Sequence, residues 1–203
     1  MADDPVVHVI DDDDAARGSL EFLIDCAGLR VRGYSSALAF LDAVGTIGPG
    51  CIVTDVRMPE MTGLELVARL RELGVAEPVI VVTGHADVPM AIQAMKQGVA
   101  DFIEKPFAAE TMLAAIRAAL ARRQSEAEGQ AERAAVRARL ATLSPRERDV
   151  LDGLVEGRAN KAIAFDLSIS ARTVEVYRAN LMAKMRAGSL SELVRMAMIA
   201  RSS

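Results

Sequence analysis

Short apolar runs that end in polar side chains recur between residues 6 and 105, with helical stretches between them. Such runs are typical of strands that are buried on both faces of a parallel sheet. The helical stretches, one of them at residues 88–97, imply right-handed crossovers and helices on both sides of that sheet. The strands are expected at residues 6–10, 29–34, 51–55, 79–83 and 102–104. The sequence therefore predicts a doubly wound α/β domain with five parallel strands in the order 2-1-3-4-5.

The polar residues at the strand ends should meet at one edge of this sheet. Asp11 and Asp12 follow the first strand, Asp55 ends the third, Thr83 ends the fourth and Lys105 follows the fifth. Open α/β sheets place their ligand sites at the carboxyl ends of the strands. Carboxylates that lie this close repel one another unless a divalent cation lies between them. Oxygen ligands without His or Cys favour Mg²⁺, with Mn²⁺ as a substitute.

This arrangement suggests phosphoryl transfer to a carboxylate. Asp12 and Asp55 would bind the metal directly, Asp11 would act through water, and the backbone carbonyl of Arg57 would complete the protein ligands. A carboxylate oxygen of Asp55 can then attack a phosphoryl donor and form an acyl phosphate. The metal and Lys105 would neutralise the charge on the transferred group.

Charge divides the chain into two parts. The first 121 residues carry 9 Lys and Arg against 18 Asp and Glu, whereas the remainder carries 15 against 10. An acidic front and a basic back suggest unlike partners, a metal for the first and nucleic acid for the second. Part of the acidic charge needs no metal, because Asp13 and Asp14 fit a solvated turn that caps the next helix.

The composition predicts a first domain at residues 1–121, a linker at 122–142 and a second unit at 143–203. The linker is rich in Ala, Glu, Gln and Arg, with Gly129 as its breaker, so it is expected to be largely helical. A solvated tether is the open alternative. The second unit begins with Ser144 as a helix N-cap and Glu147 at the third helical position. Four short helices should follow.

The third of these helices, expected from Ala171 to Met185, has two different faces. One face carries apolar residues at helical spacing, and the other is small and polar with cations at its margins, as a recognition helix in the major groove requires. Glu175 is suited to accept a hydrogen bond from a cytosine amino group, whereas each basic residue is equally consistent with a solvated charge. The predicted DNA contacts are Lys161, Arg172, Thr173, Glu175, Val176, Arg178, Ala179 and Lys184.

The cysteines and the hydropathy of the sequence predict a cytoplasmic location. Cys26 and Cys51 are interpreted as reduced thiols in the core. No basic and apolar leader opens the chain, and no apolar run approaches the roughly 20 residues of a membrane span. A cytoplasmic protein without a membrane partner is therefore expected.

The motifs resemble a known family. The order Asp11-Asp12, Asp55, Thr83 and Lys105-Pro106 resembles the receiver domain of bacterial two-component response regulators, over residues 5 to about 122. Segments 83–91 and 101–107 are similar to the FixJ subgroup, and this resemblance implies activation of nitrogen-fixation or microaerobic genes. Residues 144–201 resemble the LuxR type of helix-turn-helix domain, through the segments 143–148, 160–164 and 173–178. This second resemblance implies a helix-turn-helix motif at about residues 160–179.

The resemblance implies a mechanism and partners. Asp55 would be phosphorylated by a FixL-like sensor histidine kinase, Thr83 and Lys105 would contact the phosphoryl group, and the peptide before Pro106 would be cis. Phe102 would swing inward behind Thr83, although burial alone also explains an apolar residue there. The phosphorylated protein would form a homodimer, bind double-stranded promoter DNA and act with RNA polymerase. The chemistry would be limited to Mg²⁺-dependent self-phosphorylation and self-dephosphorylation.

Two other functions fit parts of the sequence. A phosphatase of the haloacid dehalogenase type also uses an aspartyl nucleophile, a hydroxyl, a lysine and Mg²⁺, and Asp11 and Asp13 fit its first motif faintly. However, no acidic pair follows Lys105 on a later strand, and Asp55 would have no role. The second alternative is a phosphorelay receiver whose helical tail does not bind DNA.

Overall fold

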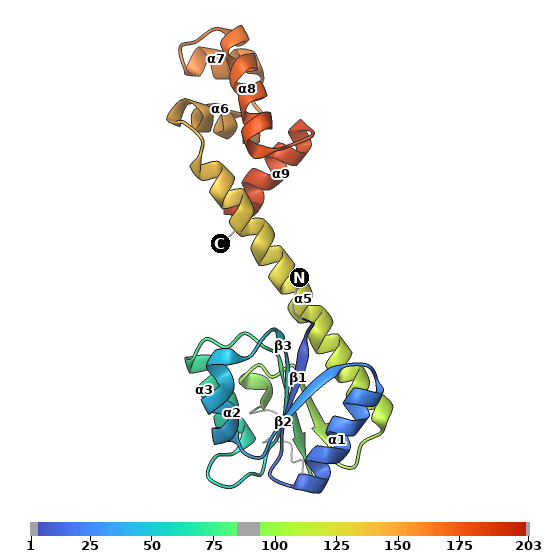
Figure 1. The fold of residues 1–203 in the computed structure, drawn as a ribbon. Coiled ribbons are helices and arrows are strands. Elements are labelled where there is room, and N and C mark those ends of the chain that lie inside the picture. The colour runs from blue at the N-terminus through green and yellow to red at the C-terminus, as the bar shows by residue number, and fades with distance from the viewer. Residues whose placement is uncertain (1–3, 85–93, 202–203) are drawn as a thin grey trace. The chain divides into compact units, whose positions relative to one another are not determined.

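The computed structural model describes residues 4–84 and 94–201 and divides the chain into two compact units, Met1–Ser125 and Glu126–Ser203. Figure 1 shows a sheet flanked by helices in the first unit and short helices in the second. The boundary between the units lies inside the residues predicted as a linker. In the described ranges, no helix is long and apolar enough to cross a bilayer.

The first unit contains a five-stranded parallel sheet in the order β2-β1-β3-β4-β5. This order confirms the predicted doubly wound fold. β1 and β3 are neighbours, with Ile10 opposite Thr54, so the residues that follow these strands lie side by side. The strands are β1 (Val6–Ile10), β2 (Arg30–Tyr34), β3 (Gly50–Asp55), β4 (Val79–Thr83) and β5 (Asp101–Glu104).

Helices cover both faces of the sheet because successive strand residues point to opposite sides. Residues such as Ile52 and Val81 pack against α2 and α3, whereas Val53 and Val82 pack against α1 and α5. The helix expected at residues 88–97 lies mostly outside the described residues, as does much of segment 83–91. The flanking helices are α1 (Asp14–Cys26), α2 (Ala37–Ala43) with the 3₁₀ turn η1 (Val44–Thr46), α3 (Gly63–Glu72) and α5 (Ala109–Ala141).

The two cysteines differ in their environment. Cys51 is buried in β3, and this burial raises the pKa of its thiol to about 12. Cys26 is exposed, so the expectation that both thiols lie in the core was wrong for this residue. Cys26 follows the buried Ile24 by two positions, which is about 200° of helix rotation and places the two side chains on opposite faces of α1.

The second unit is a small helical domain with its own core. Ser144 caps α6 through a capping box with Glu147, as predicted from the sequence. Val136 from the last turns of α5 is buried together with residues of every later helix. Residues 122–141 are helical as a continuation of α5. The later helices are α6 (Pro145–Val155), α7 (Asn160–Asp166), α8 (Ala171–Met185) and α9 (Leu190–Arg201).

A buried histidine lies in the middle of β1. His8 is only 2% exposed, and its Nδ1 is 3.3 Å from the hydroxyl oxygen of Tyr34. The rings of Tyr34 and Phe40 pack around it, with centroids 5.8 and 5.6 Å from that of the imidazole. Burial lowers the pKa of His8, and the nearby charge of Arg32 lowers it further. The folded first unit therefore keeps His8 neutral at a pH where the unfolded chain would protonate it.

This difference predicts that acid weakens the first unit through His8. Because the unfolded chain binds the proton first, unfolding free energy should fall below about pH 6.5, by up to about 1.4 kcal/mol per pH unit. His8→Phe should remove this part of the pH dependence. Urea unfolding between pH 5 and 8 measures it, with Tyr177→Phe in both proteins so that the fluorescence of Tyr34 reports the first unit. Parallel pH profiles for the two proteins would contradict the prediction.

Candidate functional site

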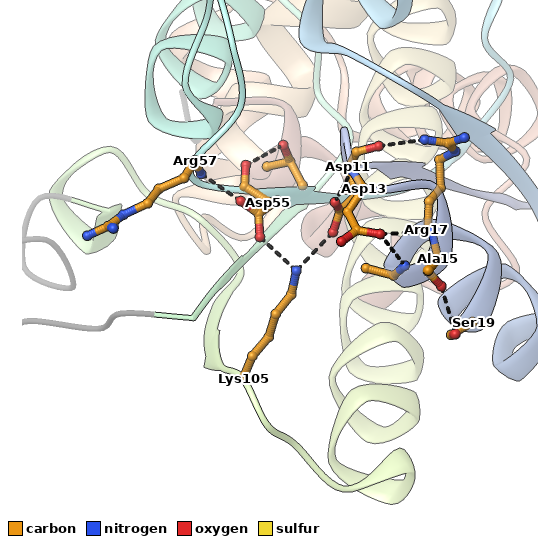
Figure 2. Close-up of polar contacts among 10 residues, drawn as sticks. Asp11, Asp13, Ala15, Arg17, Ser19, Asp55, Arg57 and Lys105 are labelled. Carbon is orange, nitrogen blue, oxygen red and sulfur yellow. Dashed lines mark hydrogen bonds and ion pairs between the residues drawn. The ribbon is translucent and has the colours of Figure 1, made fainter.

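A lysine bridges two carboxylates at the carboxyl edge of the sheet (Figure 2). Lys105 Nζ lies 2.9 Å from Asp11 Oδ2 and 2.8 Å from Asp55 Oδ1. The two carboxylate side chains are only 9% and 11% exposed. Burial would lower the pKa of Lys105, but its hydrogen bonds to Asp55 and Asp11 raise it above the usual value. The structure therefore brings together three of the residues that the sequence predicted to converge, and keeps the ammonium charged.

Local structure holds Asp55 in place for these contacts. Its second oxygen, Oδ2, accepts a hydrogen bond from the backbone N–H of Arg57 at 2.6 Å. The side chain of Arg57 is exposed and extends away from Asp55 (Figure 2). The loop returns at Gly63, where a Cβ atom would lie 2.2 Å from the carbonyl oxygen of Asp55. A side chain at position 63 would therefore push the loop away from the carboxylate.

The acidic loop after β1 is ordered by its own hydrogen bonds. Asp11 Oδ1 accepts from the backbone N–H of Asp13 at 3.0 Å. Asp13 in turn caps α1 by accepting from Ala15 and Ala16, and these bonds lower the pKa of its carboxyl group. This is the capping role predicted for Asp13. The Asp12 carboxylate is exposed and has no hydrogen bond or ion pair within the described residues.

One cation that contacts this loop, Arg17 of α1, was not predicted from the sequence. Arg17 Nη1 donates to the backbone carbonyl of Asp11 at 2.8 Å, and its other nitrogen pairs with Asp14. Its position one turn after the helix cap was the only available signal, because an arginine there is ordinarily a surface residue. Arg17 therefore lies in α1 but forms part of the acidic site through its contacts with Asp11 and Asp14.

Thr83 contacts Lys105 through its backbone, whereas Phe102 lies opposite Val81 of β4, two residues before Thr83. Thr83 is fully buried at the end of β4, and its carbonyl oxygen accepts from the backbone N–H of Lys105 at 2.7 Å. Phe102 in β5 is partly buried against the core on the α2 and α3 side. The peptide between Lys105 and Pro106 is cis, as the resemblance implied. The inward swing of Phe102 stays a prediction.

The donor set fits a divalent cation, although the carboxylates are not gathered around one point. Within the described residues, no three His, Cys, Asp or Glu side chains lie within reach of a single metal ion. Lys105 separates Asp11 from Asp55, and Asp12 is directed toward solvent. The three carboxylates outnumber the single ammonium, and their oxygens are the ligands that Mg²⁺ prefers. A cavity of about 320 Å³, lined mainly by apolar residues, opens beside Asp11, Asp55 and Lys105.

In the second unit, α8 has the two faces that its sequence predicted. Val174, Leu181 and Met185 are buried in the core of the unit. The opposite face is exposed and carries Arg172, Glu175, Val176, Ala179 and Ala183. This face has the small and polar character of a surface that reads base edges.

The basic residues near α8 fall into two groups. Lys161 and Arg172 are exposed. In contrast, Arg178 Nη1 donates to Asn160 Oδ1 at 3.0 Å, and Lys184 Nζ donates to Glu147 Oε2 at 2.7 Å. Phosphate contacts by Arg178 and Lys184 stay predictions and would compete with these bonds.

Glu147 connects α6 with α8 from a buried position. The residue is only 4% exposed, and its Oε2 also accepts from the backbone N–H of Ser144 at 2.8 Å. The hydrogen bond from Lys184 lowers the pKa of Glu147, and the bond from the Ser144 backbone adds to this effect. Lys184 therefore neutralises a buried carboxylate that the cap alone would leave unpaired.

Comparison with known protein families finds two matches. Response regulator receiver domains match residues 7–117, and the luxR family of bacterial regulatory proteins matches residues 141–197. The second match covers α6, α7, α8 and much of α9. These matches favour neither the phosphatase nor the receiver with a tail that does not bind DNA.

Individual proteins are similar over nearly the whole chain. The transcriptional regulatory protein FixJ of Azorhizobium caulinodans is 58% identical over 194 residues, 96% of this chain and 92% of that protein. FixJ of Bradyrhizobium diazoefficiens is 50% identical over 192 residues, 95% and 94% of the two chains. Among solved structures, the response regulator StyR is 35% identical with a TM-score of 0.83, covering 96% of this chain and 98% of that one. Full-length FixJ from B. japonicum is 49% identical with a TM-score of 0.63 and covers 98% of both.

The contacts of Lys184 predict that its removal destabilises the second unit. Lys184→Met leaves the buried carboxylate of Glu147 without its charged donor, so unfolding free energy should fall by about 2 kcal/mol. Lys161→Met removes an exposed charge and should change it by less than about 0.5 kcal/mol. Urea unfolding at pH 7 measures both, with Tyr34→Phe throughout so that Tyr177 reports this unit. Equal stability of the two variants would show that Glu147 does not depend on Lys184.

Proposed function

The chain belongs to the two-component response regulators that join a receiver domain to a LuxR-family DNA-binding domain, and we propose that it carries a phosphoryl signal from Asp55 to promoter DNA. The supporting observation is the bridge of Lys105 between Asp11 and Asp55. Receiver domains are phosphorylated by histidine kinases and use Mg²⁺ for this reaction. The close similarity to FixJ proteins supports a FixL-like kinase as the donor and nitrogen-fixation or microaerobic genes as targets.

Asp55 is held as a nucleophile. Lys105 fixes one carboxylate oxygen and the Arg57 N–H fixes the other, so the carboxylate faces the cavity in a defined orientation. One oxygen forms a bond to phosphorus while the P–N bond of the kinase phosphohistidine breaks, and the electron pair stays on the histidine nitrogen. Bound Mg²⁺, held by Asp11, Asp12 and Asp55 with the Arg57 carbonyl, would supply positive charge to the phosphoryl oxygens.

Phosphorylation changes the partners of Lys105. The carboxylate of Asp55 becomes an acyl phosphate, so the ammonium follows the negative charge to the phosphoryl oxygens. The backbone N–H of Lys105 donates to the carbonyl oxygen of Thr83. A movement of Lys105 therefore also displaces the ends of β4 and β5. The Thr83 hydroxyl then turns toward the phosphoryl group and Phe102 moves inward. The face formed by β5, α5 and the helix expected at residues 88–97 then pairs with that of a second phosphorylated copy; this helix lies mostly outside the described residues.

In the second unit, α8 would enter the major groove with its exposed face. The apolar residues Leu190 and Met198 of α9 are exposed beside a hollow of about 620 Å³, which supports a further contact between two copies. The paired units would then read two half-sites about one helical turn apart and act with RNA polymerase in the cytoplasm.

Base reading can be separated from phosphate contact in α7 and α8. Glu175→Ala should change the preferred base at one position, because a carboxylate accepts from the cytosine amino group. Lys161→Ala should weaken binding to every duplex by a similar factor. Binding to a library of duplexes, measured at one salt concentration, distinguishes the two effects. A uniform loss on all duplexes for Glu175→Ala would remove its assigned role.

The acceptor residue can be identified directly. The protein is incubated with acetyl phosphate and Mg²⁺, and borohydride then reduces the acyl phosphate to homoserine. We expect homoserine at position 55 by mass spectrometry, and none in Asp55→Asn. Homoserine at position 11 would instead support the phosphatase-like use of Asp11 as the nucleophile.

A further inference from the structure

We propose that Arg17 is a positioning residue for the cation site, an inference that rests on the proposed function. Arg17 lies in the first turns of α1, and its Nη1 donates to the carbonyl oxygen of Asp11 at 2.8 Å. Its Nη2 forms an ion pair with Asp14. The Arg17 side chain is 17% exposed, whereas that of Asp14 is 87% exposed. The guanidinium is therefore enclosed at the base of the acidic loop and is held there from two sides.

The hydrogen bond from Arg17 to the Asp11 carbonyl sets the orientation of the peptide that leads into Asp12. The carbonyl of Asp11 belongs to the peptide that joins it to Asp12, and this peptide is planar. Arg17 thus fixes the plane from which the Asp12 backbone continues. Because the Asp12 carboxylate has no partner within the described residues, its direction depends on that backbone. Arg17 acts on the cation through Asp11 and Asp12, as outer groups that orient metal ligands do.

A glycine in β2, Gly33, leaves room for the Arg17 side chain. Gly33 lies opposite Val9, and a Cβ atom on Gly33 would lie 3.2 Å from Arg17 Cδ and 1.8 Å from Glu21 Oε1. The missing side chain leaves room for Arg17 and Glu21 to lie against the strand. The guanidinium can therefore reach the carbonyl of Asp11 from the helix.

Positioning and bare charge predict opposite effects on cation binding. As a positive charge near the site, Arg17 would repel a divalent cation, so its loss would tighten binding. As a positioning group, Arg17 keeps Asp12 in place, so its loss would weaken binding. The sign of the change therefore decides between the two roles.

The test measures binding of Mn²⁺ alone to the full chain, from the electron paramagnetic resonance signal of the free ion. Arg17→Gln should weaken binding by about 10-fold or more. Arg17→Lys should also weaken it, because a point charge cannot make both hydrogen bonds of the guanidinium. Arg69→Gln is the matched control, since Arg69 forms an exposed pair with Glu72 three positions away and has no contact with the acidic loop. Its affinity should equal that of the wild type.

Tighter or unchanged binding in Arg17→Gln would overturn the proposal, and so would wild-type affinity in Arg17→Lys. Gly33→Ala supplies a second test without changing Arg17, and it should weaken binding in the same direction by a smaller factor. Thermal unfolding of each variant confirms that it is folded at the temperature of measurement. Absence of Mn²⁺ binding in the wild type would instead contradict the cation site of the proposed function.

Discussion

The bridge of Lys105 between Asp11 and Asp55 is the interaction on which the proposed function of the first unit depends. Two largely buried carboxylates are stable together only when a cation and hydrogen bonds compensate their charges. This compensation requires β1 next to β3 and a lysine after β5 that reaches across, and the observed strand order provides both. In the proposed function the same bridge makes the site responsive, because a phosphoryl group on Asp55 would change the charge that Lys105 neutralises.

In the second unit, an ion pair between the buried Glu147 and the exposed Lys184 joins two helices. Glu147 completes the capping box of α6 by accepting from the backbone N–H of Ser144, and it also accepts from Lys184 of α8, so one carboxylate links these two helices. The bond from Arg178 to Asn160 fixes α8 against α7 in a similar way. With its buried face held by the core and its margins held by these contacts, α8 presents a rigid exposed face. Such preorganisation reduces the entropy lost when a surface binds its target.

The strand order, the helix caps and the two faces of α8 were predictable from the sequence. Each follows from local periodicity or from the polar ends of strands. Side-chain contacts away from the strand ends were not predictable in this way. From the sequence alone, Lys184 is predicted to contact DNA phosphate. The fold shows that it donates a hydrogen bond to Glu147, 37 positions away. Arg17 has the same ambiguity, because a charged residue on a helix is usually solvated. Cys26 was assigned to the core from its apolar neighbours, although its helix phase points it outward.

The central claim is that phosphorylation at Asp55 controls DNA binding by α8. The most direct measurement is the affinity of the full chain for duplexes selected from a random pool, with and without Mg²⁺ and beryllofluoride as a phosphoryl mimic. The account predicts that beryllofluoride tightens binding of the wild type and converts it to dimers, and that Asp55→Asn shows neither change. Equal affinity of the wild type under both conditions, or the same gain in Asp55→Asn, would contradict it.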